Sequence, residues 1–80
     1  LGNITQERLL QAPLPDTLRQ FGELRRLIVR GFALKGRVPA FITEFSALQE
    51  LDLSDNELSG ELPEGVFGLP SLQRINLARN

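Results

Sequence analysis

The stretch from Leu48 to Ser71 reads LQELDLSDNELSGELPEGVFGLPS, and it decides how the chain folds. When the chain is shifted against itself by 24 residues, apolar residues meet apolar residues, and glycine and proline meet themselves. The aligned sets include Leu24/Leu48/Leu72, Leu27/Leu51/Ile75, Val29/Leu53/Leu77, Gly36/Gly60 and Pro39/Pro63. A fixed period of this length is typical of repeat proteins, in which each unit packs against its neighbours.

Apolar and polar residues alternate at the start of each unit. Leu51 and Leu53 alternate with Glu50, Asp52 and Ser54, which is the period of a short strand with one buried face. A return segment separates each strand from the next, so the strands must pair in parallel. The predicted strands span residues 26–30, 50–54 and 74–78.

The return segments are predicted to be irregular or to form short helices. Pro39 and Pro63 favour an extended approach followed by a loose or 3₁₀-like turn. Apolar pairs spaced three residues apart are expected to close this side of the core, and these pairs are Ile42/Phe45 and Val66/Leu69. Four phenylalanines are expected to pack inside the protein and not to bind a ligand: Phe21, Phe41, Phe45 and Phe67.

The first eleven residues of the quoted unit follow the string Leu-x-x-Leu-x-Leu-x-x-Asn-x-Leu, which resembles the leucine-rich-repeat family. The continuation Leu-x-Gly-x-Leu-Pro is similar to the plant-type repeats of receptor-kinase ectodomains, whereas the segment 63–67 resembles other extracellular subclasses. The resemblance implies an α/β-type solenoid, a right-handed superhelix with short parallel strands on its concave face and a 3₁₀ or irregular convex side. It also implies that Asn56 and Asn80 form a structural ladder of amides that satisfy turn backbone groups.

The N-terminal part departs from this pattern. Phe32 occupies the asparagine position of the motif, so that its turn must be built differently. Residues 1–9 carry polar residues at the aligned strand positions and are predicted to fit no repeat strand. They are either a degenerate N-terminal flank or cap, or a short helix that begins at Thr5. The solenoid is predicted to span residues 10–80, with units at about 10–23, 24–47 and 48–71 and an incomplete unit at 72–80.

The composition argues against several kinds of site. Cysteine and histidine are both absent, which removes disulfides, thiol nucleophiles and the usual zinc ligands. The net charge of −1 gives no electrostatic reason to bind nucleic acid, and no apolar run reaches the length of a membrane span. No phosphate-binding glycine loop or nucleophile elbow is present. We therefore expect no enzymatic activity, cofactor, metal site, nucleic-acid partner or membrane insertion by this segment.

The outward strand residues form the surface that the repeat organises. Arg26, Glu50 and Arg74 fall in one row of alternating charge, which predicts cross-strand ion pairs. The alternative interpretation is a solvated strand face that contacts nothing. The residues expected to contact a protein or peptide partner are Arg26, Ile28, Arg30, Glu50, Asp52, Ser54, Arg74 and Asn76.

Together these features predict a protein–protein or protein–peptide recognition module within a longer protein, such as a receptor ectodomain. Two alternatives stay open: the targeting domain of a bacterial effector, and an architectural scaffold in a larger assembly. The glycosylation triplet at 3–5 favours an extracellular or cell-surface location, whereas Lys35, the single lysine among many arginines, keeps an effector in the host cytoplasm open. An uncovered last strand at 74–78 would also permit edge-to-edge self-association.

Overall fold

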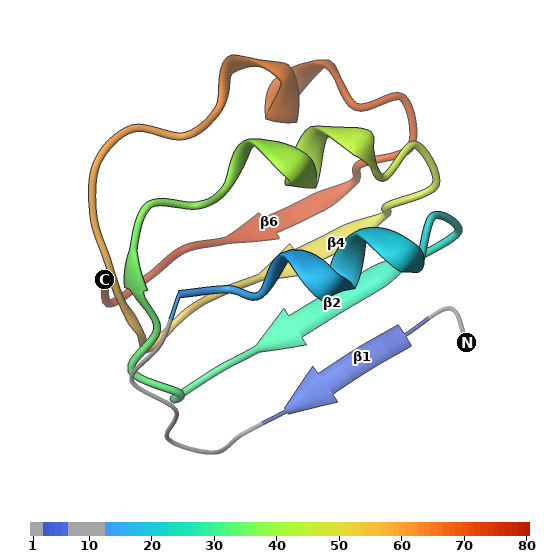
Figure 1. The fold of residues 1–80 in the computed structure, drawn as a ribbon. Coiled ribbons are helices and arrows are strands. Elements are labelled where there is room, and N and C mark those ends of the chain that lie inside the picture. The colour runs from blue at the N-terminus through green and yellow to red at the C-terminus, as the bar shows by residue number, and fades with distance from the viewer. Residues whose placement is uncertain (1–2, 7–12) are drawn as a thin grey trace.

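The computed structural model describes the backbone of residues 3–6 and the whole of residues 13–80 (Figure 1). Strands alternate with 3₁₀-helices, which carry the labels η1 to η3. The order is β1 (Asn3–Gln6), η1 (Asp16–Gln20), β2 (Arg26–Val29), β3 (Lys35–Gly36), η2 (Ala40–Glu44), β4 (Glu50–Asp52), β5 (Glu57–Leu58), η3 (Glu64–Gly68) and β6 (Arg74–Asn76).

Four strands form one parallel sheet in the order β1–β2–β4–β6. In its register Arg26 lies beside Glu50, and Glu50 lies beside Arg74, so the 24-residue period becomes the spacing of neighbouring strands. Hydrogen bonding between the neighbouring segments continues beyond the ends of β4 and β6, where the Asp55 N–H donates to the Ala78 carbonyl at 3.0 Å. The three parallel strands predicted from the sequence are confirmed, although each regular strand is shorter than expected.

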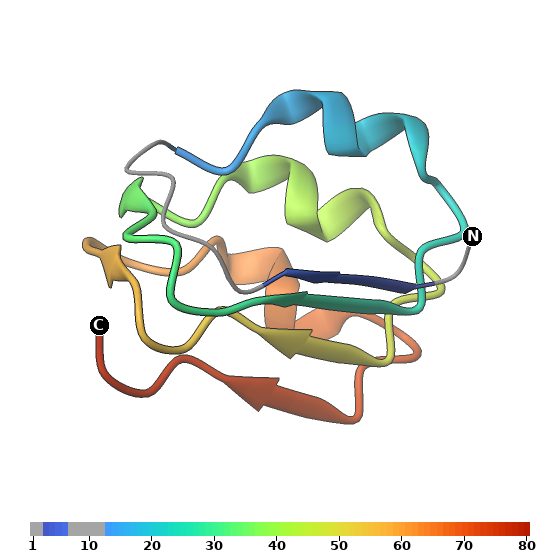
Figure 2. The ribbon, with the colours of Figure 1, turned by 90° about the horizontal axis from the view of Figure 1, so that it is seen from below.

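The 3₁₀-helices lie on the other side of the molecule from this sheet (Figure 2). Each begins directly after a proline, whose ring holds the backbone extended and whose carbonyl accepts a bond from three residues ahead. The Ile42 N–H donates to Pro39 at 3.2 Å, and the Val66 N–H donates to Pro63 at 3.1 Å. The prediction of 3₁₀-like turns after these prolines is therefore confirmed.

The hydrophobic core fills the space between the sheet and the 3₁₀-helices. Leu27 and Leu51 from the strands are fully buried, as are Ile42 and Val66 from the helices. Phe45 is also buried, and its ring meets Phe41 edge to face with centroids 6.2 Å apart. The apolar residues spaced three apart therefore close the core as the sequence predicts, with Leu69 partly buried.

Phe67 is not a packing residue, contrary to the prediction, because its side chain is 72% exposed. In the three-residue turn of η3, the inward position belongs to Val66, and the next residue must point away from the core. Thr43 holds the equivalent position in η2 and is also partly exposed. The general tendency of phenylalanine to be buried therefore gave the wrong expectation at this position.

The prediction that residues 1–9 form no repeat strand is wrong for residues 3–6. These residues form β1, which pairs in parallel with β2 so that Ile4 lies beside Leu27. The register shift between these strands is 23 residues, one fewer than elsewhere, and the 24-residue alignment had placed polar residues at the core positions. A helix beginning at Thr5 is likewise wrong for Thr5 and Gln6, and its remaining residues lie outside the described part of the chain.

A second parallel sheet was not predicted. It pairs β3 with β5, so that Lys35 lies beside Glu57 and Gly36 beside Leu58. Gly36 adopts φ +82°, a left-handed conformation that residues with a side chain rarely adopt. The glycine of the Leu-x-Gly string is thus needed where the chain leaves this short sheet.

The amide of Asn56 joins two repeats. Its Oδ1 accepts bonds from the Phe32 N–H at 2.9 Å and the Leu34 N–H at 3.2 Å, both in the preceding repeat. Its Nδ2 donates to the Val29 carbonyl at 2.8 Å and also to the carbonyls of Leu53 and Ser54. Because the residue is only 7% exposed, these bonds satisfy backbone groups that water does not reach.

Asn80 repeats this arrangement one unit later. Its Oδ1 accepts from the Leu58 N–H at 3.0 Å, and its Nδ2 donates to the Leu53 carbonyl at 2.9 Å. Each amide therefore supports the turn of the repeat before its own, as the predicted asparagine ladder requires. The departure from the motif at Phe32 leaves its turn intact. The Phe32 ring is buried in the core, and the Phe32 N–H donates to the Oδ1 of Asn56 in the next repeat.

We predict that Asn56→Ala lowers the free energy of unfolding by about 1–3 kcal/mol, because buried backbone donors and acceptors lose their partners. Chemical denaturation of the parent and the variant measures the difference. Asn80→Ala is the matched control and should have a smaller effect, since Asn80 is exposed and water can replace its amide. Equal midpoints for the parent and Asn56→Ala would contradict a structural role for this amide.

Candidate functional site

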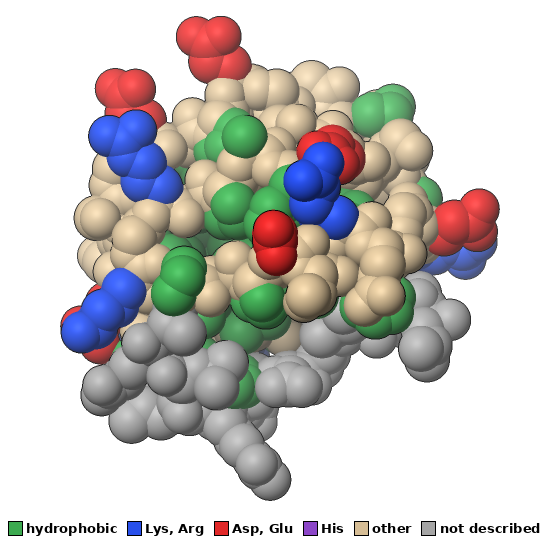
Figure 3. All heavy atoms as spheres, viewed as in Figure 1, with side chains coloured by type: hydrophobic (Ala, Val, Ile, Leu, Met, Phe, Trp, Pro, Cys, Tyr) green, Lys and Arg blue, Asp and Glu red, His purple; other side chains and the backbone are tan. Residues whose placement is uncertain are grey.

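The exposed side of the parallel sheet carries the candidate site, and we call it the strand face. Leu27 and Leu51 are buried, so one side of their strands faces the core. The residues next to them in sequence therefore lie on the opposite, exposed side. The sequence-predicted residues that reach this surface are Arg26, Ile28, Arg30, Glu50, Arg74 and Asn76, with Asp52 largely covered. Figure 3 shows the opposite side of the molecule, which carries the 3₁₀-helices, and there too acidic and basic side chains lie next to one another without one large patch of either sign.

Two ion pairs cross from β2 and its following turn to β4. The Arg26 Nε lies 2.9 Å from the Glu50 Oε1, and the Arg30 Nε lies 4.0 Å from the Asp52 Oδ2. The predicted ion pairing in the first row is confirmed for Arg26 and Glu50. Exposed pairs of this kind add little stability, so their main consequence is to fix where the charged groups lie.

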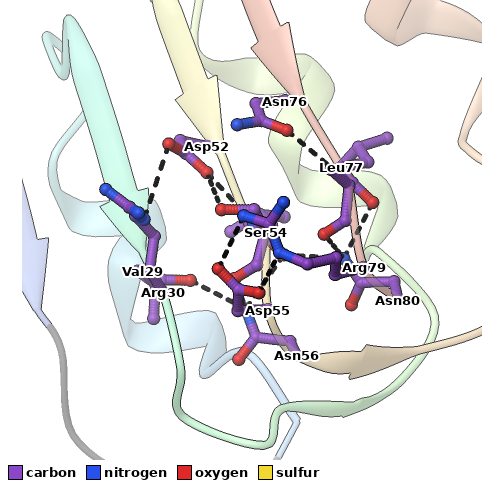
Figure 4. A network of polar contacts seen from close by, with 12 residues as sticks. Val29, Arg30, Asp52, Ser54, Asp55, Asn56, Asn76, Leu77, Arg79 and Asn80 are labelled. Atoms are coloured by element: carbon purple, nitrogen blue, oxygen red, sulfur yellow. Dashed lines mark hydrogen bonds and ion pairs between the residues drawn. The ribbon is translucent and has the colours of Figure 1, made fainter.

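Ser54 is not an outward residue, contrary to the prediction, because it is completely buried. Its Oγ donates to the Asp52 Oδ1 at 2.6 Å, and its N–H donates to the same oxygen at 3.0 Å. The carboxylate therefore folds over the serine, and Asp52 itself remains only 9% exposed (Figure 4). These two residues build the floor of the strand face, and Ser54 presents no side chain to a partner.

A third ion pair lies where the chain turns after β4 and β6. Two nitrogens of the Arg79 guanidinium approach the two oxygens of Asp55, and the Nη2–Oδ2 distance is 3.0 Å (Figure 4). Gly31, Asp55 and Arg79 hold equivalent positions in three repeats, and all three have positive φ. The shared backbone conformation at this turn therefore holds the acid and the guanidinium side by side.

This pair shifts the pKa of both of its members. The hydrogen bond and the positive charge of Arg79 hold the pKa of Asp55 below its ordinary value, and Arg30 contributes in the same direction. The bond to Asp55 in turn raises the pKa of Arg79. Each group therefore favours the charged form of the other.

Each acidic residue of the strand face lies beside an arginine. Glu50, Asp52 and Asp55 each have an arginine partner, which opposes binding of a hard cation. Within residues 3–6 and 13–80, no group of three metal-ligating side chains is brought together. The helices in these same ranges are all too short or too polar to span a bilayer.

Sequence analysis missed two residues of the strand face, Gln49 and Gln73. Together with Arg26, Glu50 and Arg74 they line a polar hollow of about 330 Å³ where β4 and β6 begin. They precede the alternating strand positions, and no local motif marks them. The one available signal was the 24-residue period, which places Gln49 and Gln73 in the same row.

We predict that the stability added by the Asp55–Arg79 pair is lost in acid. The pKa of Asp55 is lowered in the folded protein, so its contribution to stability is present above the ordinary pKa of this carboxyl, 3.8. It disappears as the pH falls through the lower folded-state pKa. Denaturation of the parent and of Asp55→Asn as a function of pH tests this prediction. Asparagine is a suitable replacement, because it also tolerates the left-handed backbone at this position.

The stability difference between the parent and Asp55→Asn should be constant near neutral pH and vanish in strong acid. Arg79→Gln should reproduce it, since this change removes the same pair from the other side. A difference that is independent of pH would show that the ion pair is not its cause.

Comparison with known proteins agrees with the periodicity and the geometry described above. The family model "Leucine rich repeat" matches residues 22–80, which is more than half of the chain and includes the strands β2, β4 and β6. No curated protein and no solved structure matches the chain. The chain therefore belongs to the leucine-rich-repeat family.

Proposed function

We propose that this chain is a recognition module for a protein or peptide, and that the partner binds the strand face. The supporting observation is the registered row of Arg26, Glu50 and Arg74 over a fully buried core. The paired strands fix the backbone that carries these side chains, so a partner has to immobilise only the side chains themselves. Repeat proteins of this architecture use the extended surface formed by their stacked units for binding.

The mixed charge of the strand face supports specific recognition of a partner and not bulk attraction. Arg26 is bonded to Glu50, and Ile28 lies partly exposed between Arg26 and Arg30. An apolar side chain flanked by guanidinium groups suits a protein surface, because arginine combines packing area with several hydrogen-bond donors. A nucleic acid would require a net positive surface, which this chain does not offer.

We further propose that the module belongs to a longer array whose strand face is concave, as in a receptor ectodomain with plant-type repeats. The left-handed Gly36 and Gly60 at the Leu-x-Gly strings support that subclass, and the Asn3-Ile4-Thr5 triplet supports an extracellular location. An effector targeting domain in the host cytoplasm is the alternative. The sequence that flanks this module in its full-length protein distinguishes the two.

A scaffold role has one observation of its own in its favour. Strand β6 pairs only with β4 among the described residues, and Ile75 on it is 38% exposed. An unpaired strand edge with an apolar side chain favours pairing with another strand, in a further repeat or in a second chain. Sedimentation over a range of concentrations tests self-association through this edge.

Selection of peptides from a displayed random library against the purified chain tests the recognition proposal. We predict that Arg26→Glu and Ile28→Arg each weaken the binding of the selected peptides more than about tenfold, because each alters the centre of the strand face. The melting temperature should change little, since neither residue belongs to the buried core. Asp52 is unsuitable for charge reversal, because it is buried and accepts bonds from Ser54.

Glu64→Arg on η3 is the matched control, because it reverses an exposed charge on the opposite layer. It should leave peptide affinity unchanged. If Glu64→Arg weakened binding while Arg26→Glu and Ile28→Arg did not, the partner would bind the 3₁₀ side of the molecule and the proposal would be wrong.

A further inference from the structure

The polar hollow of the strand face contains one more positive charge than negative charge. Its charged lining residues are Arg26, Glu50 and Arg74. The Glu50 carboxylate is bonded to Arg26, with 2.9 Å between Oε1 and Nε. Arg74 is exposed and forms no ion pair with any residue in the described part of the chain. The hollow therefore offers a guanidinium group whose donors remain available to a ligand.

We propose that this hollow is a subsite for a carboxylate side chain, Asp or Glu, on an acidic peptide segment of the partner. The inference rests on the proposed function and specifies the chemistry of the ligand. A guanidinium presents its N–H groups in a planar fork that matches the two oxygens of a carboxylate. Arg74 supplies the main contact, and Glu50 does not oppose it strongly because Arg26 already balances its charge.

Gln49 and Gln73 complete the subsite. Each amide side chain lining the hollow carries an NH₂ group that can donate to a carboxylate oxygen, and neither brings a negative charge. The two residues therefore add donors beside the guanidinium without repelling an acid. The hollow has a volume of about 330 Å³, so a carboxylate group does not fill it.

The backbone holds the walls of the hollow in place. The Gln73 N–H donates to the Gln49 carbonyl at 2.8 Å, and the Arg74 N–H donates to the same carbonyl at 3.0 Å. Both residues thus start from a fixed point at the beginning of β6. A ligand then has to immobilise only the outer parts of these side chains, which reduces the entropic cost of binding.

Nuclear magnetic resonance of the ¹⁵N-labelled chain tests this subsite directly. The probe is a tetraglutamate peptide with both ends blocked, and a blocked tetraglutamine peptide of the same length is the uncharged comparison. We expect saturable shifts of the side-chain signals of Gln49, Gln73 and Arg74 with tetraglutamate only. Arg74→Gln should raise the dissociation constant about two- to fivefold, as expected for loss of a charged contact near the surface.

Arg25→Gln is the matched control, because Arg25 is an exposed arginine near the hollow that does not line it. This variant removes the same charge and should leave the affinity for tetraglutamate unchanged. Equal weakening by Arg25→Gln and Arg74→Gln would overturn the proposal, since it would indicate only long-range attraction. Equal shifts with the tetraglutamine peptide would also overturn it.

The outcome is separable from that of the proposed function. The selected peptides could lose affinity for Arg26→Glu and Ile28→Arg and yet be neither acidic nor affected by Arg74→Gln. This result would leave the recognition proposal intact and overturn the carboxylate subsite. Binding of tetraglutamate at Arg74, together with selected peptides that respond only to Glu64→Arg, would show that the hollow binds a carboxylate but would overturn the strand-face proposal and, with it, the assignment of the hollow to the partner.

Discussion

The amide of Asn56 links its repeat to the preceding one, and the amide of Asn80 repeats this link one unit later. After a strand, the chain reverses inside the protein and leaves donors and acceptors that water cannot reach. Asn56 satisfies two such donors, at Phe32 and Leu34, and three carbonyls. Because its partners come from both its own repeat and the preceding one, the same amide closes a turn and sets the distance between repeats.

The strand face follows from this spacing. With the repeats held in register, side chains 24 residues apart become neighbours on adjacent strands, and Arg26 meets Glu50. Asp52 and Ser54 then form a hydrogen-bonded floor beneath the charged groups, which anchors the exposed layer to the core. The surface available to a partner is therefore an ordered set of charges, and Arg74 is the member whose guanidinium has no carboxylate partner among the described residues.

Three expectations failed because they depended on local pattern alone. Strand β1 was missed since its register differs by one residue, which moves Ile4 into line with Leu27. Phe67 was expected inside, but the short turn of a 3₁₀-helix places it outward. Ser54 was placed on the surface by simple alternation, although the carboxylate of Asp52 covers it. A strand distant in sequence decided the register of β1, whereas the local 3₁₀ turn decided the position of Phe67 and a carboxylate two residues away covers Ser54.

The sequence by itself determined the repeat, its parallel strands and its buried leucines, because the constraints on these features recur every 24 residues, and the resemblance to leucine-rich repeats implied the structural role of Asn56. It also predicted the row of Arg26, Glu50 and Arg74. Only the tertiary structure decided which charges pair and which residues line the hollow, and it brought Gln49 and Gln73 beside Arg74. Periodicity fixes which residues share a row, whereas rotamers and hydrogen bonds, which arise only after the strands pack, decide what each side chain contacts.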